Sequence, residues 1–145
     1  MPPRGEDRVT QLADRFVNSI VRLGQNNLLS TLRTFPLGAC GDVTLLFARH
    51  LYQNGFSLPE CVDGERDDGQ THAWIECDGL IIDLAAGQFP DAPERVIITR
   101  DRSWHAQFKE QRRHPADIGL YDENTRKYLL EAYDQIISNL AHWYL

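Results

Sequence analysis

The sequence has no excess of basic residues. Its 15 lysines and arginines stand against 21 aspartates and glutamates, which gives a formal net charge of -6. Proteins that follow a nucleic-acid backbone need clustered Lys and Arg to release counterions, so we expect no nucleic-acid partner. The basic run Arg112-Arg113-His114 is short, and a surface loop or a helix end accounts for it.

Long apolar runs are missing as well. Residues 1–8 lack the hydrophobic stretch of a signal peptide, and no segment approaches the length of a membrane span. We therefore expect no membrane partner, and the cytoplasm is the expected location. Export by a route that needs no signal peptide stays open.

Cysteine is scarce. Cys40, Cys61 and Cys77 are odd in number and widely spaced, which does not fit the disulfide framework of a small secreted protein and favours a reducing compartment. Because no Cys-x-x-Cys pair is present, a metal site built from these cysteines and His72 is a weak alternative. We expect no metal and no cofactor.

The residues that are present fit one domain. A chain of 145 residues, 42% of them hydrophobic, is long enough for a single core, so we expect one domain over 1–145. Apolar residues recur at helical spacing over about 7–23, where Gly24 supplies a stop, and again from position 40 to Asn54-Gly55. A third stripe, over about 122–142, predicts a long C-terminal helix.

The middle of the chain changes to a period of two. Alternation over 71–77 and 80–86, separated by Asp78-Gly79, predicts a hairpin with a two-residue turn. Residues 95–99 predict a further strand of the same sheet. The predicted fold class is α+β, with helices packed on a small antiparallel sheet.

Two stretches lack a clear period. Residues 63–70 are predicted to form a polar loop, and 111–121 are predicted to be the least ordered part of the chain.

Cys40 is predicted to lie at the N-terminus of the central helix. A thiol attacks an amide as the thiolate, so a catalytic cysteine needs a site that lowers its pKa, such as a helix N-terminus facing a cationic histidine. The unpaired N–H groups of the first turn would also stabilise the oxyanion of a tetrahedral intermediate. Gly41 would let a substrate carbonyl approach closely. Without a histidine nearby, a cysteine in this setting is more often a packing residue.

The predicted hairpin brings a histidine and a carboxylate together. Opposed residues share a face, so a two-residue turn makes His72 and Asp83 diagonal neighbours, about 7–8 Å apart. A carboxylate there would orient the imidazole and favour its protonated form. A three-residue turn would put the two side chains on opposite faces. The residues predicted to face the core are Ala73, Ile75, Cys77, Leu80, Ile82 and Leu84.

These segments resemble the core of the transglutaminase-like superfamily, which has a papain-like fold. In that family a Cys opens a helix, a His-Ala-Trp strand follows, and an Asp lies on the next strand. The resemblance is to a small, bacterial-type member and spans about 36–89. The sequences that carry it are GACGD at 38–42, THAWIE at 71–76 and DGLIID at 78–83.

The resemblance implies thiol-dependent acyl transfer or hydrolysis at an amide of a protein or peptide. It implies Cys40 as nucleophile, His72 as general base and acid, and Asp83 as the residue that orients His72. Peptidases, protein-glutamine deamidases and transglutaminases share this chemistry, and the sequence does not choose between water and an amine as acceptor. A catalytically inactive member that binds a peptide in the same groove is the alternative.

Further residues are candidates for the same site. Gln88, just after the second hairpin strand, offers an amide to an oxyanion, and Trp74 either walls the site or packs in the core. His105 and His114 are substitutes if His72 is not the base. Because an amide has the shape of a carboxylate, Asp83→Asn is expected to impair catalysis with little loss of folding.

Overall fold

The structure, a computed structural model, describes residues 4–27, 32, 35 and 40–143. It is α+β, with a five-stranded antiparallel sheet in the order β4-β3-β2-β1-β5. The described α-helices are α1 (Arg4–Asn27), α3 (Cys40–Gln53) and α4 (Glu123–Trp143). The strands are β1 (Glu60–Glu65), β2 (Thr71–Cys77), β3 (Leu80–Asp83), β4 (Ile97–Thr99) and β5 (Lys109–Pro115), and the short 3-10 turns are η1 (Ala86–Gln88), η2 (His105–Gln107) and η3 (Ile118–Leu120).

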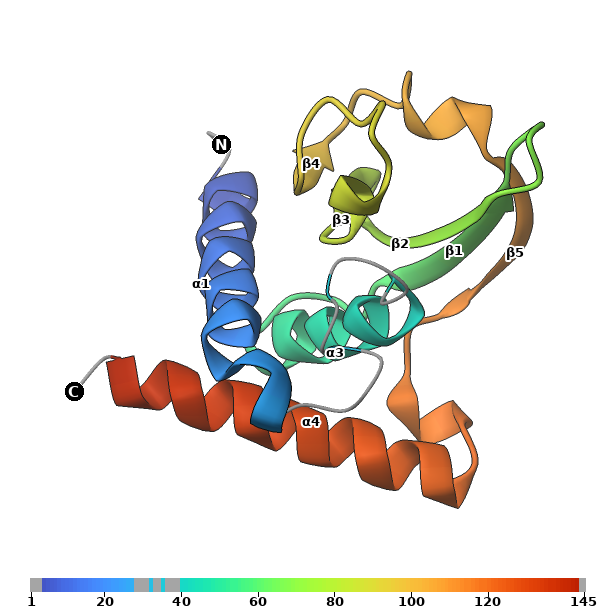
Figure 1. Ribbon diagram of the computed structural model, residues 1–145. Coiled ribbons are helices and arrows are strands. Elements are labelled where there is room, and N and C mark those ends of the chain that lie inside the picture. The colour runs from blue at the N-terminus through green and yellow to red at the C-terminus, as the bar shows by residue number, and fades with distance from the viewer. Residues whose placement is uncertain (1–3, 28–31, 33–34, 36–39, 144–145) are drawn as a thin grey trace.

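The helices lie on one face of the sheet, where α3 packs against β2, and α1 and α4 pack against each other (Figure 1). The predicted N-terminal helix is confirmed, but it continues through Gly24 to Asn27. A glycine lowers helix propensity by about 1 kcal/mol relative to alanine, which is too little to end a long helix. The predicted C-terminal helix is confirmed as α4, whose first turn is capped by the Asp122 carboxylate 2.7 Å from the Thr125 N–H.

Helix α3 ends where its sequence predicts. Gly55 has a φ of +92°, and its N–H donates to the Tyr52 carbonyl while the Phe56 N–H donates to Leu51. This pair of bonds is a Schellman motif, which needs the left-handed backbone that glycine adopts without strain. The motif fixes the C-terminal end of α3, whose first residue is Cys40.

The predicted hairpin register is confirmed. Ile75 pairs with Ile82 and Cys77 with Leu80, and the two turn residues both have positive φ, 52° at Asp78 and 81° at Gly79. That geometry is typical of a type I′ turn, whose twist matches the twist of the strands. The third predicted strand is confirmed as β4, which pairs with β3.

Both faces of the hairpin are buried. Five of the six residues predicted to face the core are buried against the helices, and the sixth, Cys77, is half-buried. The opposite face was expected to be polar, but an aromatic cluster covers it, so His72 and Asp83 are only 2% and 1% exposed. The aromatic cluster consists of Val62, Trp74, Ile81, Phe89 and Phe108, with Ala92 and Trp104 packed against it.

The predictions for 63–70 and 111–121 are wrong in part. The first segment begins within β1, and the second contains most of β5, which pairs with β1 along the outer edge of the sheet. Every side chain of β5 is exposed except that of His114, which is half-buried, so the strand has no apolar alternation for a sequence to display. Arg112 and Arg113 therefore lie on a strand, not on a loop or a helix end.

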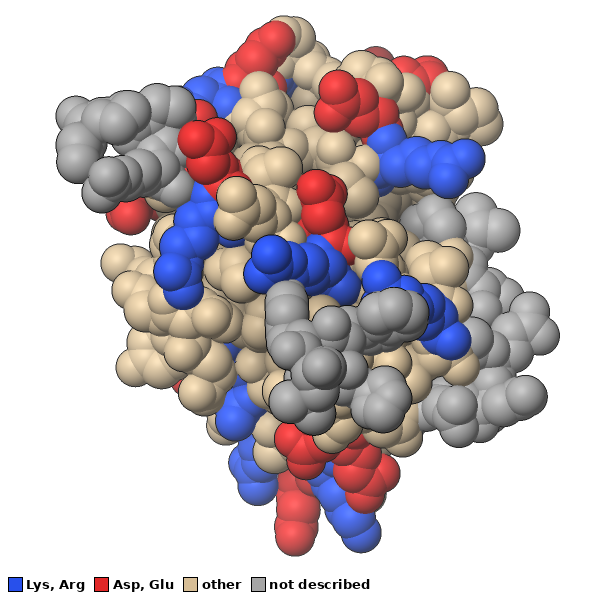
Figure 2. All heavy atoms as spheres, turned by 90° about the vertical axis from the view of Figure 1, so that its left-hand side faces the viewer, with Lys and Arg blue, Asp and Glu red and all other residues tan. Residues whose placement is uncertain are grey.

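Charged side chains of both signs are interspersed over the α1 side of the molecule (Figure 2). None of the described helices is both long and apolar enough to cross a membrane.

Candidate active site

Cys40 is the first residue of α3 and is half-buried. The helix is held against the start of β2 because one side of it, with Val43 and Phe47, is buried in the core. The Thr44 hydroxyl also lies between the carbonyl oxygens of Cys40 and Ala73, 3.5 Å from the latter. The first turn of α3 is thereby placed beside the strand that carries His72. Residues 38 and 39 of the GACGD segment lie outside the described residues.

His72 connects the thiol to the carboxylate. Its Nε2 lies 2.7 Å from Asp83 Oδ2, and the ring is close enough to the Cys40 side chain for each group to shift the pKa of the other. The imidazole contacts Phe89 edge-on, with ring centroids 4.9 Å apart, and lies 5.8 Å from the ring of Trp74. The structure thus brings together the three residues that the sequence selected, at the helix end and on the hairpin face where they were predicted.

Asp83 accepts three N–H bonds. His72 and His105 each place Nε2 at 2.7 Å from Oδ2, and the backbone N–H of Ala85 donates to Oδ1 at 3.1 Å. Burial favours the neutral form of a carboxylate, but the hydrogen bonds from His105 and His72 outweigh it and lower the pKa of Asp83. Asp83 is therefore a buried, fully bonded anion.

The thiol and the imidazole shift each other toward an ion pair. Burial alone would lower the pKa of His72, but the bonds to Asp83 and Cys40 and their charges raise it to about 9. Burial alone would raise the pKa of Cys40, whereas its bond to His72, the imidazolium charge, and hydrogen bonds from the Ala73 backbone and the Gln88 side chain lower it. Between these two pKa values the thiolate–imidazolium form dominates.

The three further candidates have different positions. Gln88 lies in the site, with its amide nitrogen 3.1 Å from His72 Nδ1, and its side chain helps to lower the pKa of Cys40. Gly41 is exposed in the first turn of α3, and no described atom lies within 4 Å of a Cβ placed on it, so a ligand has room there. Trp74 is 3% exposed and contacts His72 and His105, so it packs the imidazoles from inside the protein.

The position of His105 is one that the sequence did not predict. It is the second histidine on Asp83, held by edge-on contacts with Trp74 and Trp104. Its Nδ1 is buried and has no hydrogen-bond partner among the described residues. Residue 105 sits on the isolated turn η2, so no strand or helix period could have aligned it with Asp83. His114 lies elsewhere, on β5.

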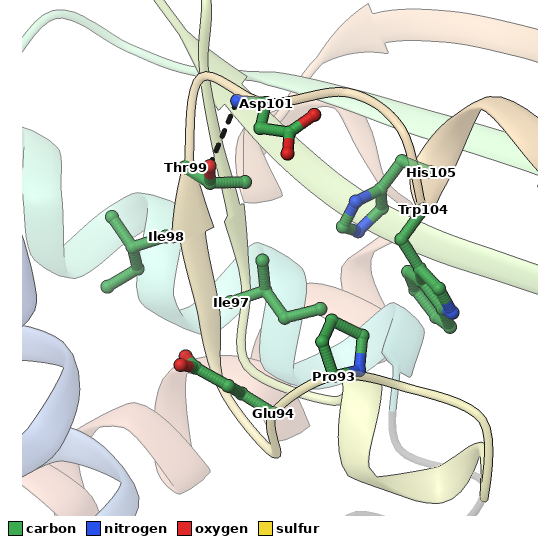
Figure 3. Close-up of a pocket in the computed structure, with 8 residues that line it drawn as sticks. All are labelled: Pro93, Glu94, Ile97, Ile98, Thr99, Asp101, Trp104 and His105. Atoms are coloured by element: carbon green, nitrogen blue, oxygen red, sulfur yellow. Dashed lines mark hydrogen bonds between the residues drawn. The ribbon is translucent and has the colours of Figure 1, made fainter.

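A cavity of about 250 Å³ adjoins His105 (Figure 3). Trp104 and His105 line one side of it, and Ile97 of β4 lines the other, with Glu94 and Asp101 also contributing carboxylates. Neither Cys40 nor His72 belongs to its lining.

The metal alternative from the sequence is wrong for the described residues. All three cysteines are free, and Cys40, Cys61, Cys77 and His72 do not form a ligand group. His72, Asp83 and His105 do bring their ligand atoms within 4.8 Å of one another, but both Nε2 atoms are already bonded to one carboxylate oxygen. The ligand atoms of this group are therefore already engaged in hydrogen bonds with one another.

No protein-family model, curated protein or solved structure matches this chain. The functional argument therefore depends on the geometry and electrostatics of the described side chains.

The first testable consequence is selective reactivity of one cysteine. Iodoacetamide at pH 6 should modify Cys40 rapidly and leave the other two cysteines largely unmodified, since thiolates are the reactive form. Burial, followed by the charge of Asp63, raises the pKa of Cys61 to about 12, and burial likewise raises that of Cys77. Peptide mass mapping over time measures each site in the same sample.

His72→Ala removes the cationic partner and should move the Cys40 pH–reactivity curve toward that of a free thiol, near 8.5. Identical curves for wild type and His72→Ala would show that no thiolate–imidazolium pair exists.

Proposed function

We propose that this protein is a cysteine-nucleophile enzyme that hydrolyses or transfers the acyl group of an amide in a protein or peptide. One observation carries the proposal: Cys40, at the N-terminus of α3, and His72 shift each other's pKa toward the ion pair, while His72 Nε2 is bonded at 2.7 Å to the buried Asp83 carboxylate. A nucleophile, a base bonded to it and a third group that orients the base are the geometric signature of covalent catalysis. The resemblance of the same segments to the transglutaminase-like superfamily supports the same chemistry.

The proposed reaction begins with the Cys40 thiolate, which forms a C–S bond to the amide carbonyl carbon. The Gln88 amide and the free N–H groups of the first turn of α3, including that of Gly41, stabilise the oxyanion. The His72 imidazolium donates its proton to the amide nitrogen, the C–N bond breaks and the amine leaves. His72 is then neutral and takes a proton from water, which attacks the thioester and releases the carboxylate and the thiolate. An amine in place of water would give transamidation.

Asp83 and the aromatic cluster support this role by fixing the imidazole. With Nε2 bonded to Asp83, the other ring nitrogen, Nδ1, faces Gln88 and the thiol side of the site. The neutral ring then has its lone pair on Nδ1, which is the tautomer that a base for Cys40 needs. The aromatic rings also exclude water, which strengthens the pairing of charges.

An assay with three readouts tests the proposed reaction and identifies the acceptor. Purified protein is incubated with an unfolded protein and a library of glutamine-containing peptides in the presence of a fluorescent primary amine. We expect new peptide termini, released ammonia or incorporated amine, and a loss of about 10⁴-fold or more in Cys40→Ala. Turnover that is equal in wild type and Cys40→Ala, or a lack of all three products, would contradict the proposal and favour the inactive peptide-binding alternative.

The burial of Asp83 changes the expected result of its amide substitution. In Asp83→Asn, the NH₂ group must face either the two imidazole N–H groups or the N–H of Ala85, unless His72 changes tautomer and loses its lone pair on Nδ1. We therefore expect the free energy of unfolding to fall by about 1–3 kcal/mol and Cys40 reactivity at pH 6 to be lost. Urea denaturation and alkylation rates measure the two effects.

Asp78→Asn is the matched control, because Asp78 is exposed and its turn position also accepts asparagine. If Asp83→Asn and Asp78→Asn have the same free energy of unfolding, the site tolerates an amide in place of the carboxylate, as the sequence alone predicts.

His105 is proposed as a positioning residue that shares the charge of Asp83. His105→Leu removes one of two N–H donors to a buried carboxylate, so we expect a loss of about 1–3 kcal/mol in the free energy of unfolding. Because Asp83 then acts on one histidine only, the pKa of His72 should rise further, as measured by ¹⁵N shifts of the ring nitrogens.

His105→Gln keeps an N–H donor and should lie closer to wild type in the His72 titration. If His105→Leu and His105→Gln both leave the pKa of His72 unchanged, the role of His105 is packing and not the positioning of Asp83.

A further inference from the structure

A second cluster of ligand-type side chains lies on β1 and β5 and includes none of Cys40, His72 and Asp83. Cys61 is the direct cross-strand partner of His114, and Asp63 follows Cys61 by two residues, so all three side chains share one face of the sheet. The Cys61 sulfur, one Asp63 carboxylate oxygen and one His114 ring nitrogen lie within 4.8 Å of one another. Backbone pairing alone thus brings a thiol, a carboxylate and an imidazole to one point.

The orientation of His114 is an independent observation at this cluster. Its Nδ1 lies 3.0 Å from the carbonyl oxygen of Pro115, which fixes the hydrogen on Nδ1. Nε2 then presents a lone pair, is itself buried, and has no hydrogen-bond partner among the described residues. It lies 3.8 Å from Asp63 Oδ2, beyond hydrogen-bond distance. An imidazole that bonds a backbone carbonyl through one nitrogen and leaves the other free is the usual state of a metal-binding histidine.

We propose that Cys61, Asp63 and His114 bind a divalent transition-metal ion of the zinc type. Sulfur, imidazole and carboxylate are the donors that Zn²⁺ takes in proteins, and three protein ligands leave a fourth position for water. Binding replaces the S–H bond of Cys61 by a metal–sulfur bond and releases one proton to solvent. The Arg112 Nε–H donates to Asp63 Oδ2 at 3.0 Å, and ligating carboxylates are commonly hydrogen-bonded in this way.

The metal would fasten the edge of the sheet. In the described chain β5 pairs with β1 alone, and it follows directly from η2 and Phe108, which carry His105 and part of the aromatic cluster. The inference does not depend on the proposed enzymatic activity, because the ligands lie outside the Cys40 site.

Cobalt is the probe for the test, because a Co²⁺–thiolate bond gives a near-ultraviolet charge-transfer band. The full chain is freed of metal with a chelator and titrated with Co²⁺, and Zn²⁺ is then added as a competitor. We expect the band to appear with one equivalent of Co²⁺, to disappear when Zn²⁺ is added, and the melting temperature to rise with either ion.

Variants identify the ligands. Cys61→Ser should lose the band, whereas Cys40→Ser and Cys77→Ser should keep it. Asp63→Asn and His114→Gln should weaken Co²⁺ affinity at least tenfold, with unchanged circular dichroism in the absence of metal. The lack of a band in wild type, or a band that survives Cys61→Ser, would overturn the proposal.

Discussion

The buried carboxylate of Asp83 is the constraint on which the site depends. A carboxylate that is 1% exposed and has no partner would destabilise the fold through its desolvation free energy. Asp83 instead accepts hydrogen bonds from N–H groups of β2, η2 and the backbone at Ala85. Those bonds join three segments that are distant in sequence. The interaction that orients His72 therefore also fixes the turn η2 on the sheet.

The two faces of the hairpin pack against different parts of the molecule. Apolar residues on one face pack against α1, α3 and α4 and supply the core. The aromatic cluster on the other face encloses His72, Asp83 and His105, where both imidazole Nε2 atoms are bonded to the carboxylate. Because the cluster keeps water away, the charges of Asp83 and His72 act on each other and on Cys40 with little screening. Glu76 is a second buried carboxylate on this face, and it is paired with Arg102 and Arg113.

The sequence predicts those parts of the molecule that depend on local patterns. The period of α3 and its Asn54-Gly55 end locate Cys40, and the two-residue turn at Asp78-Gly79 sets the parity that puts His72 and Asp83 on one face. What it could not predict depends on pairing between distant segments. Strand β5 is polar on both faces and exists because β1 offers a partner, and His105 reaches Asp83 only through the tertiary fold. His105 lies on a short turn, so no helical or strand periodicity in the sequence marks it as the partner of Asp83.

The hairpin turn also limits how the chain can change in length. Inserting or deleting one residue between positions 72 and 83 would turn Asp83 toward the helices and move an isoleucine under the aromatic rings. Two residues added together at the Asp78-Gly79 tip would lengthen the loop and preserve the alternation. Variants that gain or lose residues here can therefore keep this site only in even steps.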